Sequence, residues 1–356
     1  MNKSKLILTV IVLSLISFSL IAFLKNRNSY YFKLPVIDKL AQDQEIGGLD
    51  KLTPHPLSIE ALKKGEYPGS DLTIEQTLSS GSNYKRYIAS YKSEGLKIFG
   101  LLTVPIGEEP EDGWPAIIFN HGYIPPAQYR TTERYSAYTD GFSRAGYVLF
   151  RPDYRGHGNS EGEASGAYGS NDYTIDVLNA FYSVKNLPYV NREKIGMWGH
   201  SLGGFVTLRS MVVSKDIKAG VIWAGVVGSY EDLFSRWRRR NIPSTTPGSR
   251  GGSWRQQLSR EYGEPDKNPE FWHSLSANYF LADISGPLQL HHGTADSSVP
   301  LEFSEKLVQQ MKNIGKEADL FTYSGDDHNL SAYFNSAMQR SVEFFNKYLK
   351  GGETNL

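Results

Sequence analysis

Apolar and polar positions divide the chain into strand-like and helix-like segments. Residues 84–105 alternate between apolar and polar on either side of Glu94-Gly95, which predicts a β-hairpin. Short apolar runs predict further strands at 115–120, 147–154, 194–198, 219–228, 287–293 and 318–323. Apolar residues at helical spacing predict helices at 170–187, 203–213, 300–315 and 330–352. Because strands alternate with helices, we predict a mostly parallel central sheet with helices on both faces and the antiparallel hairpin at one edge.

An uncharged apolar run of 19 residues, 6–24, lies near the N-terminus, with Lys3 and Lys5 before it and Lys25 and Arg27 after it. At about 1.5 Å per residue, a helix of this length just crosses a hydrocarbon core of about 30 Å. A cleaved secretory signal is the competing interpretation, but the run is long for one and no small-x-small cleavage site follows. We therefore expect a membrane-anchored or secreted protein whose folded part is extracytoplasmic.

Composition and charge narrow the class further. Lysine plus arginine and aspartate plus glutamate both number 38, so the formal net charge is zero and gives no argument for a nucleic-acid partner. The chain has no cysteine, which excludes disulfides, thiol catalysis and cysteine-bound zinc. We predict an anchor or signal over 1–27, a stalk and N-terminal extension over 28–83 with a short helix at 59–64, and one large domain over 84–350. An irregular stretch at 229–283 would form a small lid insertion.

The motif G-x-S-x-G, which can carry a nucleophilic serine, occurs twice, around Ser160 and around Ser201. Ser201 directly follows a predicted strand and opens a predicted helix, which is the setting that a nucleophile elbow needs. Gly199 and Gly203 suit the tight turn, and the helix N-terminus directs N–H groups at developing negative charge. Ser160 lies between polar, glycine-rich segments, so we interpret it as a turn residue.

A serine hydroxyl needs a general base, and the base needs a group that orients it. Asp296 follows the strand at 287–293 and His328 follows the strand at 318–323, at the carboxyl ends where open α/β sheets build their sites. Asp296 has a competing interpretation as a helix cap, and Asp326 and Asp327 are alternative orienting groups.

An oxyanion needs two backbone donors. We predict the N–H of Leu202, directly after Ser201, and the N–H of Tyr123, in the loop after the strand at 115–120. No metal or cofactor is expected. His291 and His292 are adjacent on a strand and point to opposite faces, no H-E-x-x-H spacing occurs, and no glycine-rich nucleotide motif opens a helix after a strand.

These segments resemble a known superfamily. GHSLGG around Ser201, GTADSSVP around Asp296, His328 before Asn329, His121-Gly122 and RPDYRGHGNSEG are similar to the α/β-hydrolases. More narrowly, they resemble the prolyl oligopeptidase (S9) catalytic domain and its dienelactone-hydrolase-like relatives, over roughly residues 84–350. The resemblance implies the α/β-hydrolase fold and a serine hydrolase that cleaves ester or peptide bonds through an acyl-enzyme. The chain departs from S9 peptidases in having His-Gly-Tyr for His-Gly-Gly, and the roughly 60 residues between the apolar segment and the fold are too few for a β-propeller.

The predicted lid is rich in arginine. Residues 236–260 contain seven arginines and no acidic residue. Candidate substrate contacts in this stretch are Arg236, Trp237, Arg238 and Trp254. A solvated face is the plainer interpretation, and the sharper ones are selection of anionic substrates or contact with anionic lipid headgroups.

Two classes of function follow from these observations. The first is a serine hydrolase acting on a small ester or a short peptide, of which a peptidase and a carboxylesterase are variants. The second is a catalytically silent binding protein on the same fold, because a fold alone does not secure an activity. The complete Ser-Asp-His set favours the enzyme.

Overall fold

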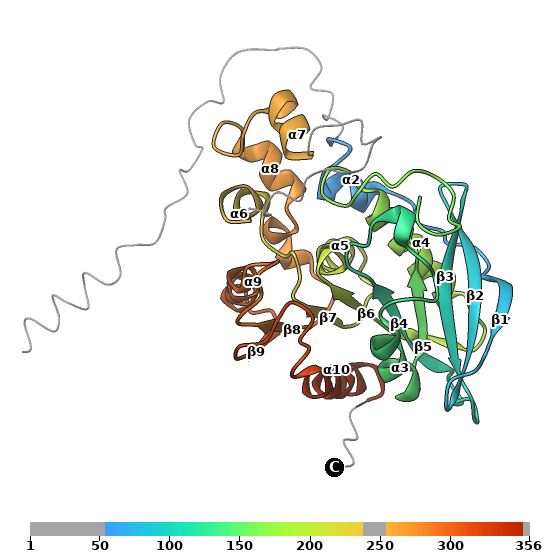
Figure 1. Ribbon diagram of the computed structural model, residues 1–356. Coiled ribbons are helices and arrows are strands. Elements are labelled where there is room, and N and C mark those ends of the chain that lie inside the picture. The colour runs from blue at the N-terminus through green and yellow to red at the C-terminus, as the bar shows by residue number, and fades with distance from the viewer. Residues whose placement is uncertain (1–53, 238–253, 352–356) are drawn as a thin grey trace, which may run out of the picture. The chain divides into compact units, whose positions relative to one another are not determined.

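A single sheet organises the part of the chain that the computed structural model describes, residues 54–237 and 254–351 (Figure 1). Nine strands of these ranges pair in the order β1-β2-β3-β5-β4-β6-β7-β8-β9. Neighbours from β1 to β5 in this order are antiparallel, and neighbours from β5 to β9 are parallel. The strands are β1 (Thr73–Leu78), β2 (Tyr84–Ser93), β3 (Leu96–Pro105), β4 (Trp114–Asn120), β5 (Val148–Pro152), β6 (Val190–His200), β7 (Gly220–Trp223), β8 (Leu288–Gly293) and β9 (Ala318–Tyr323).

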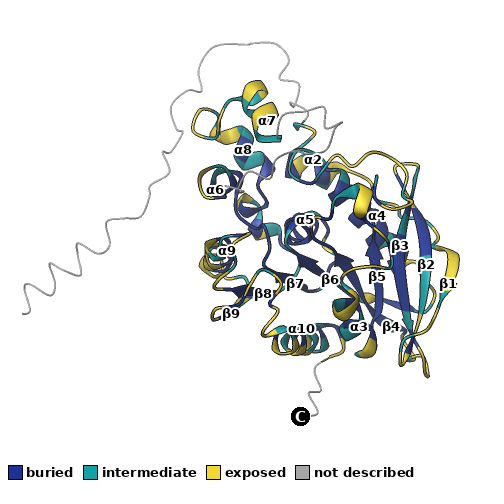
Figure 2. Cartoon of the chain, viewed as in Figure 1, coloured by how far each residue is buried: buried dark blue, intermediate teal, exposed yellow. Residues whose placement is uncertain are grey.

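Helices cover both faces of this sheet. Ile117 and Phe119 of β4 pack in a cluster with α3 and α10, whereas Ala116 and Ile118 pack in a second cluster with α2, α4, α5 and α9. This alternation follows from the pleat of the strand, and Figure 2 shows the central strands as fully buried. The helices are α2 (Ile59–Lys64), α3 (Ser136–Arg144), α4 (Asp172–Lys185), α5 (Leu202–Val213), α6 (Tyr230–Ser235), α7 (Trp254–Tyr262), α8 (Pro269–Leu275), α9 (Leu301–Asn313) and α10 (Phe334–Leu349).

The predicted fold class is confirmed: this is an α/β-hydrolase fold with an antiparallel edge. The hairpin of β2 and β3 turns at Glu94 and Gly95, which have φ values of 48° and 82°. Positive φ at both turn positions matches the right-handed twist of the strands, and glycine suits the second position.

The sheet extends further toward the N-terminus than residue 84. β1 pairs with β2, and α2 buries Ile59 and Leu62 in the core. Sequence analysis placed α2 at its observed bounds, but β1 gave no signal because five of its six residues are exposed. Helix α3 was also missed, since its sequence SAYTDGFSR is short, largely polar and contains glycine.

The insertion between β7 and β8 contains more regular structure than the sequence suggested. Within its described residues lie α6, α7 and α8, each between six and nine residues long. The side chains of Ser229 and Asn268 cap α6 and α8 by accepting hydrogen bonds from backbone N–H groups. Helices of this length show too little of an amphipathic period to be recognised from apolar spacing.

The predicted membrane segment, residues 6–24, lies outside the described residues. Among the described helices, none combines the length and the apolar character that a membrane crossing requires. The extracytoplasmic location therefore stays a prediction from the sequence.

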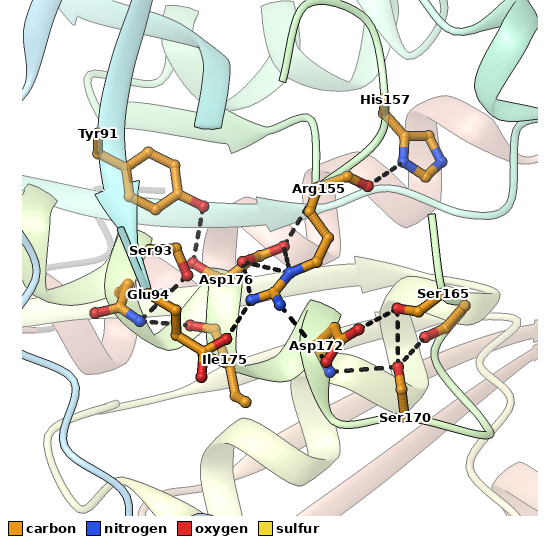
Figure 3. A network of polar contacts seen from close by, with 12 residues as sticks. Tyr91, Ser93, Glu94, Arg155, His157, Ser165, Ser170, Asp172, Ile175 and Asp176 are labelled. Atoms are coloured by element: carbon orange, nitrogen blue, oxygen red, sulfur yellow. Dashed lines mark hydrogen bonds and ion pairs between the residues drawn. The ribbon is translucent and has the colours of Figure 1, made fainter. Parts of the chain in front are cut away.

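A buried ion pair fixes the loop after β5 to α4 (Figure 3). The Arg155 guanidinium donates to both carboxylate oxygens of Asp176 at 2.8–3.1 Å, and the Arg155 backbone N–H adds a bond of 2.9 Å. The Asp176 side chain is completely buried and that of Arg155 is 10% exposed. Arg155 also donates to Glu94 in the hairpin turn at 2.8 Å, but the Glu94 side chain is 52% exposed. One guanidinium therefore joins three separate segments of the chain.

Replacing Asp176 by Asn should lower the free energy of unfolding by about 3–5 kcal/mol, because it leaves the guanidinium of Arg155 poorly compensated inside the protein. Glu94→Gln is the matched control on the same arginine, and it should cost at most about 1 kcal/mol, since its charge is solvated. Urea unfolding followed by circular dichroism measures both. Equal losses in the two variants would contradict the role assigned to the buried pair.

Candidate active site

Ser201 occupies a strained turn between β6 and α5. Its backbone has φ 56° and ψ −117°, which neither a strand nor a helix adopts. Hydrogen bonds hold both sides of this residue: its N–H donates to Trp223 at the end of β7 at 3.0 Å, and its carbonyl accepts from Val226 at 3.0 Å. The turn therefore has the form of a nucleophile elbow, as the strand–turn–helix context predicted.

The flanking glycines are required by close packing. A Cβ atom on Gly199 would overlap the carbonyl of Gly203, and one on Gly203 would overlap the carbonyl of Asn120 in β4. A Cβ on Gly204 would lie 2.7 Å from the Cα of Gly225. Helix α5 thus approaches the sheet at a distance that only glycine permits.

The second G-x-S-x-G motif has a structural role. The Ser160 hydroxyl accepts a hydrogen bond of 3.0 Å from the N–H of Phe99, and the Ser160 N–H donates to His157 at 2.9 Å. Ser160 belongs to a loop that is bonded to β3, and it does not line the cavity beside Ser201. Its interpretation as a turn residue agrees with these contacts.

Asp296 and His328 meet at the carboxyl edge of the sheet. Oδ2 of Asp296 lies 2.7 Å from Nδ1 of His328, and the Asp296 side chain is completely buried. Although burial raises the pKa of Asp296, hydrogen bonds from His292 and His328 hold it well below its usual range. Because the carboxylate is ionised and can only accept, it fixes the proton of His328 on Nδ1 and leaves Nε2 available as a base.

Asp296 also performs the capping role that was its competing interpretation. Its Oδ1 accepts from the backbone N–H groups of Ser298 and Val299 at 2.7 and 3.0 Å, ahead of α9. The two carboxylate oxygens therefore have separate partners, one in the loop and one on the imidazole. The loop contacts hold the carboxylate in the orientation that His328 requires.

The alternative orienting groups hold the loop around His328 instead. Asp326 accepts from the N–H groups of Ala332 and Tyr333 at 3.1 and 3.0 Å. Asp327 accepts from the N–H groups of Asn329 and Ser331 at 2.9 and 3.1 Å. Both carboxylates are engaged in turns of the backbone, and the imidazole of His328 is hydrogen-bonded to Asp296.

The loop after β4 lies directly against the elbow. A Cβ atom built on Gly122 would lie 3.2 Å from the Cβ of Ser201, so the two backbones are in contact. Tyr123 follows in this loop, and its side chain is 53% exposed. Leu202 is the first residue of α5, where N–H groups have no partner within the helix. The two predicted oxyanion donors therefore come from segments that flank Ser201.

A cavity of about 630 Å³ opens over these residues. The described residues that line it include Ser201, His328, Tyr123, Arg134, Tyr135, Trp237, Ser298, Val299 and Asn329. This volume lies within the range of roughly 300–1,000 Å³ that is typical of small-molecule sites. The structure thus brings Ser201, Tyr123 and His328 to one cavity, with Asp296 behind the imidazole.

A hydrogen-bonded chain that no sequence pattern indicated links the loops after β4, β6 and β9. The Tyr135 hydroxyl accepts from the Gly122 N–H at 2.9 Å and lies 2.7 Å from Nδ1 of His200. Nε2 of His200 lies 2.9 Å from the carbonyl oxygen of His328. Since a carbonyl only accepts, Nε2 carries the proton. Burial lowers the pKa of His200 to about 3, so the ring is neutral and Nδ1 accepts from the Tyr135 hydroxyl. Each of the three donors in this series of hydrogen bonds, the Gly122 N–H, the Tyr135 hydroxyl and Nε2 of His200, therefore has an acceptor.

A buried arginine holds Tyr135 in place. Arg134 and Tyr135 both have φ 51°, a left-handed conformation that is strained for residues other than glycine. The Arg151 guanidinium donates to the carbonyls of Thr131, Glu133 and Arg134, and the side chain is buried. An arginine inside the apolar run at 147–154 is the one sequence signal for this arrangement, because such a charge must find partners.

No group of three or more potential metal ligands occurs among the described residues. The two adjacent histidines of β8 have other partners. His291 lies 2.7 Å from the Tyr323 hydroxyl and from Gln289, and His292 lies 2.8 Å from the Ser304 hydroxyl. His292 also lies 3.1 Å from Asp296, so it supports the carboxylate rather than a metal.

Comparison with known proteins decides the family. The sequence profile of the prolyl oligopeptidase family matches residues 133–352, more than half of the chain. The chain belongs to the prolyl oligopeptidase family. This membership makes it a hydrolase related to the S9 peptidases, in agreement with the resemblance found in the sequence.

Two curated members of the family from Bacillus subtilis illustrate the range of lengths. The uncharacterized peptidase YtmA is 26% identical over 255 residues, a match that covers 70% of this chain and 88% of YtmA. The uncharacterized peptidase YuxL is 27% identical over 254 residues, which covers 67% of this chain and 34% of YuxL. The chain therefore spans most of one relative and about a third of the other.

Solved structures show the same fold in peptidases and in an esterase. An acylaminoacyl peptidase from Pyrococcus horikoshii superposes with a TM-score of 0.61 at 22% identity, covering 77% of this chain and 44% of that one. Est1E from Butyrivibrio proteoclasticus, solved with ferulic acid, superposes with a TM-score of 0.56 at 21% identity. That match covers 73% of this chain and 99% of Est1E. The fold thus carries enzymes with different substrates.

The substrate contacts predicted in the insertion differ in whether they line the cavity. Trp237 lines the cavity, and its indole N–H donates to the carbonyl of Ser298 at 2.8 Å. Arg236 forms an ion pair with Glu302, and Trp254 packs against Tyr168, Tyr230 and Phe234 without lining the cavity. Arg238 lies outside the described residues. Of the three that the structure describes, Trp237 is the one that lines the cavity beside Ser201.

Tyr135→Phe should lower kcat for ester hydrolysis roughly 10- to 100-fold with little change in KM, because small displacements of aligned groups cost about this much. The variant removes the acceptor of the Gly122 N–H and the donor to His200. Tyr147→Phe is the matched control, since its buried hydroxyl donates to Asn346 at 2.8 Å, away from the cavity. Both variants should lose about 1 kcal/mol of stability, and only Tyr135→Phe should lose turnover. Equal turnover in the two would contradict a positioning role.

Proposed function

We propose that this member of the prolyl oligopeptidase family is a serine hydrolase that cleaves ester or peptide bonds of small substrates. One observation carries the proposal. His328 is oriented at 2.7 Å by the buried carboxylate of Asp296, and it lines the same cavity as the strained serine of the elbow, Ser201. Nucleophile, base and orienting group thus come from the loops after β6, β9 and β8.

The first half of the reaction forms an acyl-enzyme. Oγ of Ser201 attacks the substrate carbonyl carbon while Nε2 of His328 takes the hydroxyl proton. The carbonyl oxygen becomes an oxyanion, which the N–H groups of Leu202 and Tyr123 stabilise. When this intermediate collapses, Nε2 returns its proton to the departing alcohol or amine.

The second half releases the acid. A water molecule gives a proton to Nε2 of His328 and attacks the acyl carbon, and a second oxyanion forms at the same donors. Collapse then breaks the bond to Oγ of Ser201, which recovers its proton from the imidazolium. Asp296 stabilises that imidazolium in both halves and keeps the proton on Nδ1.

The size of the cavity supports a small substrate. About 630 Å³ accommodates a short peptide or a small ester, and Ile124, Trp237 and Val299 give it apolar walls. Relatives of known structure include both peptidases and an esterase, so the fold is compatible with either leaving group. A silent binding protein is disfavoured, because the strained turn and the oriented imidazole have no evident use without the reaction.

A fluorophosphonate probe tests the nucleophile. The full chain should be labelled, Ser201→Ala should lose both the label and hydrolysis of 4-nitrophenyl butyrate, and Ser160→Ala should keep both. Ser160 is the matched control because it has the same motif in a different structural setting. A labelled Ser201→Ala variant, or an inactive but folded Ser160→Ala variant, would overturn the assignment.

Asp296→Asn tests the orienting group. The amide keeps an oxygen for the N–H groups of Ser298 and Val299, but its NH₂ group would face His328 and favour the wrong tautomer. Turnover should fall by about 10³- to 10⁴-fold. Thermal unfolding checks that the variant remains folded. Near-normal turnover in a folded variant would transfer the role to Asp326 or Asp327.

A further inference from the structure

Within the described part of the chain, a single permanent charge lines the cavity beside Ser201. Among the described residues of its wall, Arg134 is the one lysine, arginine, aspartate or glutamate. The polar groups that accompany it there, such as Ser297, Ser298 and Asn329, are uncharged, and His200 is neutral. The described wall of the cavity therefore has a positive charge that no acidic neighbour in the wall offsets.

The guanidinium of Arg134 has no partner among the described residues, in contrast to other arginines nearby. Arg144 pairs with Asp140, Arg155 with Asp176, and Arg236 with Glu302. Among the described residues, Arg134 forms a hydrogen bond through its backbone carbonyl, which accepts from the Arg151 guanidinium at 2.8 Å, and not through its side chain. A guanidinium has five donors in a planar fork that matches a carboxylate, so an unpaired one on a residue that lines a substrate cavity is suited to bind that group.

The backbone that presents Arg134 is strained and firmly held. Its φ of 51° is followed by the same value at Tyr135, and the buried guanidinium of Arg151 fixes the carbonyls on this turn. Such strain persists only where the surroundings impose it, and it is concentrated at functional positions. The turn places Tyr135 against His200 and Arg134 at the wall of the same cavity.

We propose that Arg134 binds a carboxylate of the substrate, so that the preferred substrates are esters or peptides that carry a carboxylate close to the bond that is cleaved. This inference rests on the proposed hydrolase function and adds the chemical class of its substrate. Selection of anionic substrates was one interpretation of the arginine-rich insertion. Our proposal assigns this chemistry to an arginine of the loop before α3, and within the described part of the insertion Arg236 is paired with Glu302.

Matched esters test the preference. Mono-4-nitrophenyl adipate carries a carboxylate on the acyl side, and its methyl ester is the neutral counterpart of nearly equal size. 3-Carboxy-4-nitrophenyl butyrate carries the carboxylate on the leaving group, and 4-nitrophenyl butyrate is its neutral counterpart. Arg134 should favour the anionic member of at least one pair in kcat/KM, and the pair that responds identifies the side of the substrate that it contacts.

Arg134→Gln should reduce the anionic-to-neutral ratio of kcat/KM by roughly 10- to 100-fold, the range for loss of a charged hydrogen-bonded contact. Arg134→Glu should reduce the ratio further, and Arg134→Lys should restore part of it. Arg144→Gln is the matched control, because Arg144 is 62% exposed on α3 and does not line the cavity, and it should leave both rates unchanged. Raising the ionic strength should lower the ratio of the unmodified chain.

The experiment distinguishes failure of the proposed hydrolase function from failure of the role proposed for Arg134. If the unmodified chain hydrolyses neither member of either pair and resists the fluorophosphonate probe, the proposed function fails. If it hydrolyses the neutral esters but shows no anionic preference, or if Arg134→Gln leaves the ratio unchanged, the function stands and the role of Arg134 is overturned.

Discussion

The backbone of Ser201 is the constraint on which the rest of the site depends. With φ 56° and ψ −117°, the residue can belong to neither neighbour, so β6 ends at His200 and α5 begins at Leu202. A turn of this kind costs about 1–3 kcal/mol and persists only where packing imposes it. Here the packing is the close approach of α5 to β4, where a Cβ on Gly203 would overlap the Asn120 carbonyl. The same approach places the N-terminus of the helix beside the serine, so one packing feature both creates the strain and brings the first backbone N–H groups of α5 near Ser201.

A second strained turn, at Arg134 and Tyr135, is coupled to the first through a buried histidine. His200 is bonded on one side to Tyr135 and on the other to the carbonyl of His328. Because burial lowers the pKa of His200 to about 3, its ring stays neutral at neutral pH and its hydrogen bonds keep one direction. The single tautomer of His200 therefore fixes the relative positions of three loops that are distant in the sequence. In this family member, His200, the residue before the proposed nucleophile, is therefore part of the framework of the candidate site.

The sequence indicated candidate site residues where they directly follow a predicted strand. Asp296 and His328 were found because each directly follows an apolar run, and parallel strands bring their carboxyl ends to one edge. The sequence alone does not separate Asp296 from Asp326 and Asp327 in the same way, since the difference depends on side-chain direction in loops that have no regular pattern. Tyr135 could not be found, because its partner His200 is 65 residues away and belongs to another loop. For Arg151 a signal existed, a charge within an apolar strand, but it says only that partners must exist and does not name them.

Substrate charge bears on specificity and on catalysis in different ways at this site. The acidic product of hydrolysis is negatively charged, so a substrate that carries its carboxylate on the acyl side becomes a dianion. Its second charge forms next to Ser201 and near the ionised Asp296, which is buried behind His328 and repels it. Arg134, by contrast, is exposed, so solvent and salt would weaken its attraction for a substrate carboxylate. Under the role proposed for Arg134, substrate selection would depend on a solvated contact at the wall of the cavity, whereas the Asp296 carboxylate that would assist the reaction is buried.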